Sequence, residues 1–303
     1  METGAPTTAD LSEADVADRD LRRMRAALDE LFSCARQYRS SQSYLALLEF
    51  VGRFRFYSPF NAMLIHTQMP GARFVAPASR WLRKFRRNIK TSARPIVVLQ
   101  PMGPVLFVFD VSDTEALPEA PALPPSVTNP FAVRAGCVGH ELEQTIENAK
   151  RDGVDVLKLP QGSQRAGAIR LSNPGLYLNV AEAGVAEPVP RRYDLTLNSN
   201  LSREAAFATL VHELAHLYCG HLGSPDKAWW PDRRGMKVEI KEFEAESVCY
   251  LVCTRLGIDN PSAEYLAGHV RKFDETPPIG LDAVMKAAWL IERMGRQPLS
   301  SRG

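Results

Sequence analysis

His212-Glu213-Leu214-Ala215-His216 is the stretch that decides how this chain is interpreted. In a helix, residues four apart lie on one face, so both imidazoles can reach one ion from a single turn. Glu213 projects beside them and can hold a water molecule without taking a ligand position. The surrounding sequence supplies buried faces for such a helix at Ala205, Ala206, Leu210, Val211 and Leu214. The pattern therefore predicts a metal site on a buried helix.

A third metal ligand must come from elsewhere in the chain. A histidine six residues after His216 is absent, because that position is Leu222. A downstream helix offers Glu242 and Glu246, which are one turn apart and share a face. One carboxylate can bind the metal while the other accepts the Nδ1–H of a ligand histidine. Two carboxylates on a buried face, such as Glu242 and Glu246, repel each other unless a cation lies between them. The alternative for this acidic cluster is a solvated helix face, which accounts easily for Glu239 and Glu244.

The ligand set predicts a chemistry. Two imidazoles and one carboxylate with an open fourth position form the catalytic zinc pattern, so one Zn²⁺ is expected, although the ligand types also accommodate Mn²⁺ or Fe²⁺. In the expected reaction Glu213 takes a proton from the metal-activated water, which attacks a polarised carbonyl. Glu213 then passes the proton to the leaving nitrogen. Peptide-bond hydrolysis is the natural outcome, with a protein or peptide as substrate.

The composition outside the motif is that of an ordinary soluble protein. The chain is 45% hydrophobic and 24% charged. Its length of 303 residues suggests two domains. Its longest apolar runs are too short to span a bilayer, and its acidic start lacks a secretory signal, so no membrane association is expected. Five cysteines without a CxxC pair fit reduced thiols. We therefore expect a cytoplasmic protein.

Charge is distributed unevenly along the chain. Residues 1–20 hold six acidic residues against one Arg, whereas residues 21–100 hold 15 Lys and Arg against three acidic residues. A basic block on a nearly neutral chain is typical of a surface that binds a polyanion such as nucleic acid. The alternative is a solvated helix face with a few arginine stems packed on apolar surface.

The chain divides at a proline-rich stretch. Residues 1–20 are expected to be disordered, and 21–116 to form a domain of helices and a small sheet, with helices at 21–56 and 60–67 and strands at 95–100 and 105–110. Five prolines within 117–130 predict a linker. A second domain follows over 131–297, and 298–303 is a tail. The predicted fold class is α+β.

The second domain has its own expected order of elements. A helix is expected at 139–151, followed by short strands at 154–159, 168–171, 176–180 and 193–197. Asn200 or Ser202 would cap the helix that carries the histidines and runs to about Cys219. The glutamate helix is expected over 238–256, closed by Gly257, with two more helices near 262–273 and 281–294.

Two parts of the sequence resemble known families. His212–His216 together with Glu242-Phe243-Glu244-Ala245-Glu246 resembles the glutamate-zincin pattern of ImmA/IrrE-like metallopeptidases. The stretch from Tyr57 to Ile65, then Gln68–Ala72 and Trp81, resembles the single-stranded-DNA-binding domain of ArdC-like antirestriction proteins. The likeness covers roughly residues 44–114 and 192–295.

The resemblance implies a single-stranded-DNA-binding domain joined to a zincin-like peptidase domain. It implies that His212, His216 and Glu242 are the ligands and that Glu213 is the base. It also implies that Glu246 is a carboxylate that hydrogen-bonds a ligand histidine without binding the metal. The positions proposed for DNA contact are Arg80, Trp81, Arg83, Lys84, Arg86, Arg87 and Lys90. The chain departs from the pattern twice: residues 86–94 lack the glycines of the family's turn, and Glu246 stands where many zincins have Asp.

Three functions follow as hypotheses. The first is a zinc metallopeptidase with a DNA-binding domain, cleaving a regulatory protein in a mobile-element or stress setting. The second is a DNA-binding antirestriction-type protein whose metal site is structural. The third is a metal-dependent regulator whose basic block binds an acidic protein.

Four other features have ordinary interpretations. His221 lies off the ligand face and is expected at the surface or at a helix end. Cys249 and Cys253, four apart in an apolar helix, are expected in the core. Trp81 and Phe85 are also four apart, which predicts a buried face for Phe85 and leaves Trp81 open between the core and base stacking. Trp229-Trp230 could line a cleft or staple a loop.

Overall fold

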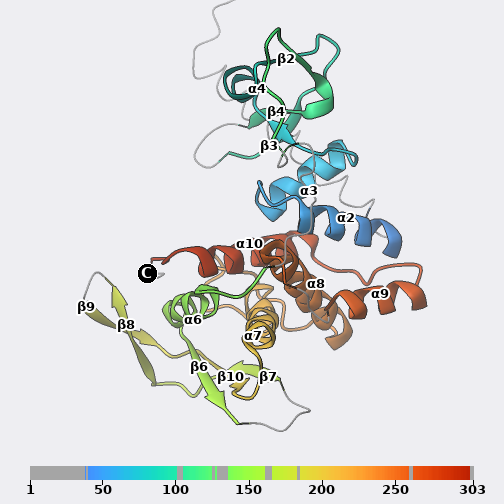
Figure 1. Cartoon of the computed structure of the whole chain (residues 1–303). Helices are drawn as coiled ribbons and strands as arrows, with labels where there is room; N and C mark the ends of the chain where they lie inside the picture. Colours follow the sequence, from blue (N-terminus) through green and yellow to red (C-terminus); the bar gives the residue numbers. More distant parts are fainter. Residues whose placement is uncertain are drawn as a thin grey trace, which may run out of the picture.

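The computed structural model describes residues 38, 40–100, 105–124, 127, 136–160, 166–182, 185–258 and 262–300, with only the backbone for 181, 182, 185, 186, 270 and 271. The expected disordered start, the expected helix before residue 38, most of 125–135 and residues 301–303 lie outside the described residues. Helices and short strands both build the described part, and the strands form small sheets, so the fold is α+β as predicted (Figure 1).

The described helices are α2 (Ser41–Arg53), α3 (Pro59–Gln68), α4 (Ala78–Phe85), α6 (Glu141–Arg151), α7 (Arg203–Tyr218), α8 (Val238–Leu256), α9 (Ser262–Lys272) and α10 (Leu281–Arg296). The described strands are β1 (Val75–Ala76), β2 (Arg87–Ile89), β3 (Ile96–Val98), β4 (Leu106–Asp110), β5 (Thr114–Ala116), β6 (Val154–Leu159), β7 (Gly167–Leu171), β8 (Tyr177–Glu182), β9 (Val185–Pro190) and β10 (Tyr193–Asn198).

A small module of strands around α4 stands at one end of the molecule (Figure 1). Strands β1, β4 and β3 form one antiparallel sheet in that order, and β2 pairs with β5. One face of α4 carries Trp81 and Phe85, which pack edge-on against Phe74 in a core of their own. Arg86 ends α4 in the left-handed conformation, with φ at 53°, and turns the chain into β2.

Helices α2 and α3 lie between this module and the C-terminal helices (Figure 1). Ser40 and Ser58 cap them by accepting a backbone N–H at each helix start, and Pro59 occupies the first turn of α3, where it costs no helical hydrogen bond. Helix α2 packs on α8 and α3 packs on α10, with Tyr44 against Phe243. The first part of the range 21–116 therefore shares its apolar core with the C-terminal helices.

A buried arginine joins α8 to the end of α2. The Arg255 guanidinium donates to the carbonyls of Val51, Phe54 and Tyr57 at 2.9, 3.1 and 2.6 Å. It also bonds the Glu292 carboxylate of α10 at 3.1 Å. The last carbonyls of a helix have no partner within the helix, so these bonds cap α2 while they tie three helices together.

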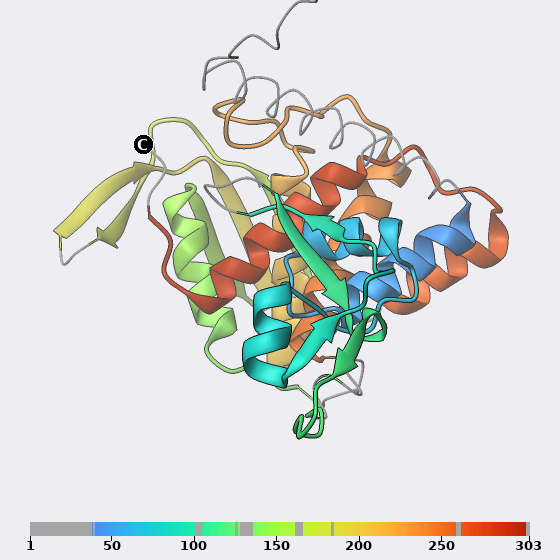
Figure 2. The same cartoon turned by 90° about the horizontal axis from the view of Figure 1, so that it is seen from above.

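The sheet of the C-terminal part has the order β6-β10-β7. Strand β10 runs parallel to β6 and antiparallel to β7, with Leu195 opposite Val156 on one side and Ile169 on the other. Strands β8 and β9 pair as a separate hairpin that projects from the molecule (Figure 2). Strand β7 packs against α7, so it lies beside the helix that carries the histidine motif.

Helices α7 and α8 lie side by side and carry the predicted site (Figure 1). Ser202 caps α7, and Gly257 ends α8 with φ at 92°, a conformation that favours glycine. The predicted α8 boundaries, residues 238–256, are confirmed. Within the described residues, no helix is both long and apolar enough to cross a membrane.

Candidate metal centre

The two histidines of the motif lie next to each other on one face of α7. Their Nε2 atoms are 3.2 Å apart, and their ring centroids are 5.0 Å apart. The rings are mostly covered, with 20% of the His212 side chain and 15% of the His216 side chain exposed. Helical spacing alone produces this pairing, because positions i and i+4 meet on the helix surface.

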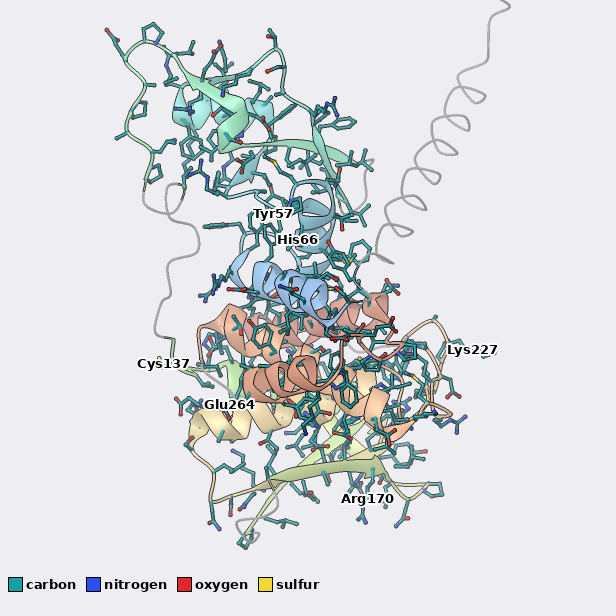
Figure 3. All side chains as sticks on the ribbon, turned by 90° about the vertical axis from the view of Figure 1, so that its right-hand side faces the viewer. Tyr57, His66, Cys137, Arg170, Lys227 and Glu264 are labelled. Carbon is teal, nitrogen blue, oxygen red and sulfur yellow. The ribbon has the colours of Figure 1, made fainter. Side chains whose placement is uncertain are left out.

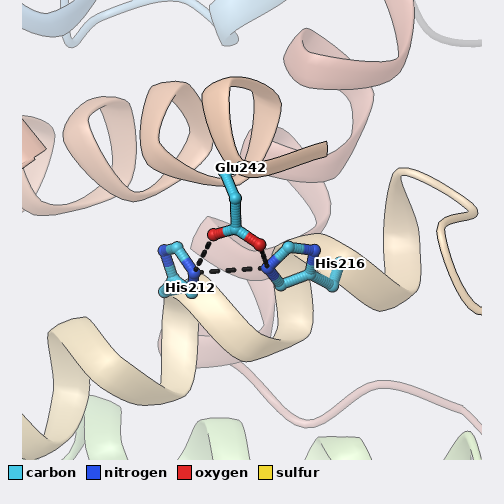
Figure 4. Close-up of side chains that lie close together, drawn as sticks. All are labelled: His212, His216 and Glu242. Carbon is cyan, nitrogen blue, oxygen red and sulfur yellow. Dashed lines mark hydrogen bonds and ion pairs between the residues drawn. The ribbon is translucent and has the colours of Figure 1, made fainter. Parts of the chain in front are cut away.

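Glu242 reaches across from α8 to both imidazoles (Figure 4). One carboxylate oxygen lies 3.5 Å from His212 Nε2, and the other lies 3.5 Å from His216 Nε2. Donor atoms about 2.0–2.1 Å from a tetrahedral ion lie about 3.3 Å apart. Each imidazole Nε2 is close to this distance from the other and from one oxygen of Glu242, so the group is compact enough for a single zinc ion. The structure brings these three residues together as a group that could hold a metal.

The charges around the site favour a cation. Burial lowers the pKa of His212, but the Glu242 and Glu246 carboxylates outweigh it and raise this pKa to about 9. The pKa of His216 falls to about 4 because it is buried and lies beside His212. Two imidazoles this close disfavour protonation of both rings at neutral pH, so one ring is neutral and has a nitrogen lone pair that a metal can use.

Glu246 lies one turn beyond Glu242 and faces the other side of His212. Its carboxylate is 3.6 Å from His212 Nδ1, within ion-pair range but longer than a hydrogen bond. The carboxylate faces the ring nitrogen that points away from Glu242, so it can orient the His212 ring, the role expected from the sequence.

Glu213 lies where α7 meets β7, and its charge also contributes to the raised pKa of His212. A Cβ built on Gly167 of β7 would lie 3.5 Å from Glu213 Cγ, which places the stem of this side chain next to the strand. The same Cβ would lie 2.6 Å from Thr209 Cγ2 and 2.9 Å from the Thr196 carbonyl. Gly167 therefore permits close contact between β7, β10 and α7 at the point where Glu213 lies.

His221 was expected at the surface or at a helix end; it lies just past the end of α7, but it is not at the surface. Its side chain is only 2% exposed, and Nδ1 lies 3.0 Å from His216 Nδ1. Gly220, with φ at 83°, reverses the chain after α7, and a Cβ there would lie 1.9 Å from the Pro231 carbonyl. Helical spacing cannot place a residue beyond such a turn. Gly220 directly after the helix was the signal available in the sequence.

The prediction of a solvated Glu244 is also wrong. Its side chain is fully buried, and its carboxylate bonds His221 Nε2 at 2.9 Å and the Arg233 guanidinium at 2.6 and 2.7 Å. Glu244 is two residues from both Glu242 and Glu246, so it faces away from the ligand side of α8.

The remaining alternatives from the sequence are resolved by burial. Cys249 and Cys253 are in the core, as predicted. Trp230 is buried, and its indole N–H donates to the Gly223 carbonyl at 2.8 Å, so it staples the loop between α7 and α8. Trp81 is fully buried, and its indole N–H donates to the Phe109 carbonyl at 2.9 Å. The proposal of Trp81 as a DNA contact is corrected, because neither ring face is open to a base.

Most of the proposed DNA-contacting cations lie on the surface of the small module. Arg80, Arg83, Lys84, Arg86 and Lys90 are exposed on or next to α4 and β2. Arg87 is half-buried, and its guanidinium bonds Thr114 through both the hydroxyl and the carbonyl. Figure 3 places Tyr57 and His66 in the layer next to this module, while Arg170 of β7 lies at the opposite end of the molecule.

Comparison with known proteins yields distant likenesses. No family model matches the chain. An uncharacterized protein of Bacillus anthracis is 24% identical over 282 residues, which cover 77% of this chain and 44% of that protein. This chain therefore spans less than half the length of the relative that it matches.

Two solved structures are similar to the chain. They are the antirestriction protein ArdC from the R388 plasmid, metal-free at 15% identity and Mn(II)-bound at 14%. Both have a TM-score of 0.33, over 79% of this chain and 82% of that one. Likeness at this level identifies neither a family nor an activity, so the function is argued from the geometry of the site.

Proposed function

We propose that this chain is a metal-dependent peptidase whose single ion is held by His212, His216 and Glu242. The observation that carries the proposal is the convergence of two imidazole nitrogens and one carboxylate within 3.2–3.5 Å of one another. Zinc suits this donor set, and the ArdC structure with Mn(II) belongs to a protein that this chain resembles only distantly.

The site offers an open side for a substrate. The Glu242 side chain is 42% exposed, so the ligand group borders solvent rather than closing around the ion. A structural zinc site usually has four protein ligands, whereas a catalytic one keeps a position open. Three ligands at a partly exposed position favour the catalytic interpretation.

A polypeptide substrate is favoured by the strand next to Glu213. Within the described residues, β7 pairs with β10 alone, so its other edge presents backbone N–H and C=O groups. An extended peptide can add to such an edge through main-chain hydrogen bonds. Because Glu213 lies beside Gly167 of the same strand, a peptide held there would have its backbone near the carboxylate.

The roles of the residues follow from this arrangement. A zinc ion bound here would supply Lewis acidity and would lower the pKa of a water molecule toward neutrality. Glu213 accepts the proton of the attacking water and delivers it to the leaving amine nitrogen. His212, His216 and Glu242 hold the ion, and Glu246 orients the His212 ring.

The test is the Glu213→Gln variant of the zinc-loaded protein, assayed on a pool of fluorescence-quenched peptides. We expect cleavage to fall at least about 100-fold while zinc content is unchanged, because proton transfer is worth about 10²–10⁴. Glu204→Gln, an exposed glutamate in the first turn of the same helix, is the matched control. Full activity in Glu213→Gln, or a zinc-loaded wild type that cleaves nothing, would refute the peptidase.

A second candidate function is DNA binding by the small module, with the metal site structural. The observation in its favour is the group of exposed cations on α4 and on either side of β2, for which the described residues show no ion pair with an acidic group. Phosphate contacts make single-strand affinity depend on salt, with a log–log slope of about −0.7 per contact.

Binding of a labelled single-stranded oligonucleotide tests this candidate. Arg83→Ala with Lys84→Ala should weaken binding and reduce the salt slope, whereas Lys158→Ala, an exposed cation on β6, should not. Binding that persists in Glu213→Gln and Glu242→Gln, in a protein without peptidase activity, would favour this second function. Salt-independent or absent binding would exclude it.

A further inference from the structure

We propose that His221, Glu244 and Arg233 form a buried hydrogen-bonded chain that positions His216 as a metal ligand. The role rests on the metal centre proposed above and adds residues to it. These three residues come from three places in the sequence: the turn after α7, the middle of α8 and the loop between the two helices.

The hydrogen bonds run without a break from Arg233, which is partly exposed, to His216. Arg233 Nη1 and Nη2 lie 2.7 and 2.6 Å from the two Glu244 oxygens. Glu244 Oε2 lies 2.9 Å from His221 Nε2, and His221 Nδ1 lies 3.0 Å from His216 Nδ1. The other nitrogen of His216, Nε2, is the one that faces Glu242.

Counting donors and acceptors fixes the tautomers along this chain. Glu244 Oε1 accepts from Arg233 and from the Gly280 backbone N–H at 2.6 Å, so every partner of this carboxylate is a donor. His221 must therefore donate through Nε2–H. In a neutral ring this leaves Nδ1 as an acceptor. His216 must then donate through Nδ1–H, which leaves its Nε2 lone pair free for a metal.

The same cluster has the spacing of a second metal site, but its chemistry argues against one. Cys219, His221 and Glu244 are all buried and close enough to share an ion. The four lone-pair positions of the Glu244 carboxylate are already used by Arg233 twice, by Gly280 and by His221. A cation would also meet the positive guanidinium. Arg233 thus supplies the positive charge that balances Glu244.

The two metal-ligand histidines are supported differently. His212 faces a partly exposed carboxylate at 3.6 Å, whereas His216 faces a chain whose inner members are almost fully buried. Burying a carboxylate carries a large desolvation cost unless the carboxylate is fully hydrogen-bonded. Here each bond is made, so the orientation of the His216 ring is fixed before any ion arrives.

Metal affinity tests this positioning role without any measurement of catalysis. The probes are Zn²⁺ in competition with a chromophoric chelator, and Co²⁺, whose visible spectrum reports ligand geometry. His221→Phe keeps a ring but removes the acceptor, and we expect it to weaken Zn²⁺ binding about 10–100-fold and to change the Co²⁺ spectrum. His221→Gln keeps an acceptor and a donor and should recover most of the affinity.

Tyr218→Phe is the matched control. It removes a buried hydrogen bond to Asp152 near the same helix end and leaves the hydrogen bonds of Arg233, Glu244 and His221 unchanged. It should leave metal affinity within about threefold. Unchanged Zn²⁺ affinity and an unchanged Co²⁺ spectrum in folded His221→Phe would overturn the positioning role alone. A wild type that binds neither ion would overturn the metal centre itself.

Histidine tautomers in the wild type provide a readout that does not depend on variants folding. Two-bond ¹H–¹⁵N correlations of the zinc-loaded protein should show His221 protonated at Nε2 and His216 protonated at Nδ1. A His221 ring protonated at Nδ1 would overturn the proposed direction of the chain.

Discussion

Replacing Arg255 by Met should separate the contribution of its hydrogen bonds from that of its volume. The side chain is 1% exposed and donates to the Val51, Phe54 and Tyr57 carbonyls and to Glu292. Met fills similar space without any donor. The carbonyls at the end of α2 then lose this donor in surroundings that water does not reach.

The magnitude follows from the surroundings of each acceptor. A buried acceptor that loses its donor costs about 1–3 kcal/mol, and the bonds to Val51 and Phe54 are both buried. The Tyr57 bond is partly exposed, and Glu292 keeps Arg296 as a partner, so these two add less. We expect a loss of about 4 kcal/mol, a large part of a typical 5–15 kcal/mol.

Urea unfolding and calorimetry measure this loss. At about 2 °C per kcal/mol for a chain of this size, Tm should fall by about 8 °C. Arg296→Met is the control, because this exposed partner of Glu292 should cost less than about 1 kcal/mol. Zinc affinity should be unchanged, since Arg255 is 13 residues, about 20 Å, along α8 from Glu242. Equal losses in the two variants would refute the reasoning.

Three further predictions concern other parts of the fold. Gly167→Ala should cost about 1–3 kcal/mol and reduce peptide cleavage, because its Cβ would lie 2.6 Å from a Thr209 methyl. Gly235→Ala, with open space around its Cβ, is the unfolding control, and equal stability of the two would contradict this. Burial raises the pKa of Tyr193 to about 12, so its share of stability is complete below pH 10 and is lost as pH rises through 12. Tyr193→Phe should therefore flatten the alkaline fall in unfolding free energy, and an unchanged slope would contradict this. Trp81→Phe should lower the free energy of unfolding by about 2 kcal/mol while oligonucleotide affinity stays constant. Weaker oligonucleotide binding by a variant of unchanged stability would contradict the assignment of Trp81 to the core.

Local signals in the sequence predicted most of the helices well. Ser202 and Gly257 mark the start of α7 and the end of α8 because a capping hydroxyl and a left-handed glycine act within one turn of chain. The strand β9 was not predicted, since Pro188 and Pro190 normally count against strands. Within the described residues β9 pairs with β8 alone, and an edge position tolerates proline.

Contacts between distant segments could not be predicted in the same way. Helical spacing brought His212, His216 and the Glu242–Glu246 pair to notice, because each pattern is contained in one helix. His221 and Glu244 meet only after Gly220 reverses the chain, and Arg233 joins them from a loop. A proline-rich stretch suggested a domain boundary, but it carried no information on how α2 and α3 pack against α8 and α10.

Apolar packing holds in position the two helices that carry His212, His216 and Glu242. Leu210 and Leu214 of α7 and Phe243 and Val248 of α8 are fully buried in one core. If the proposed metal centre holds an ion, we therefore expect stripping and reloading to be reversible binding by a folded protein, in contrast to small zinc domains that unfold without their ion. The fraction of molecules that carry metal at the proposed centre should then follow the free ion concentration, and the supply of each ion should help to decide which one is bound.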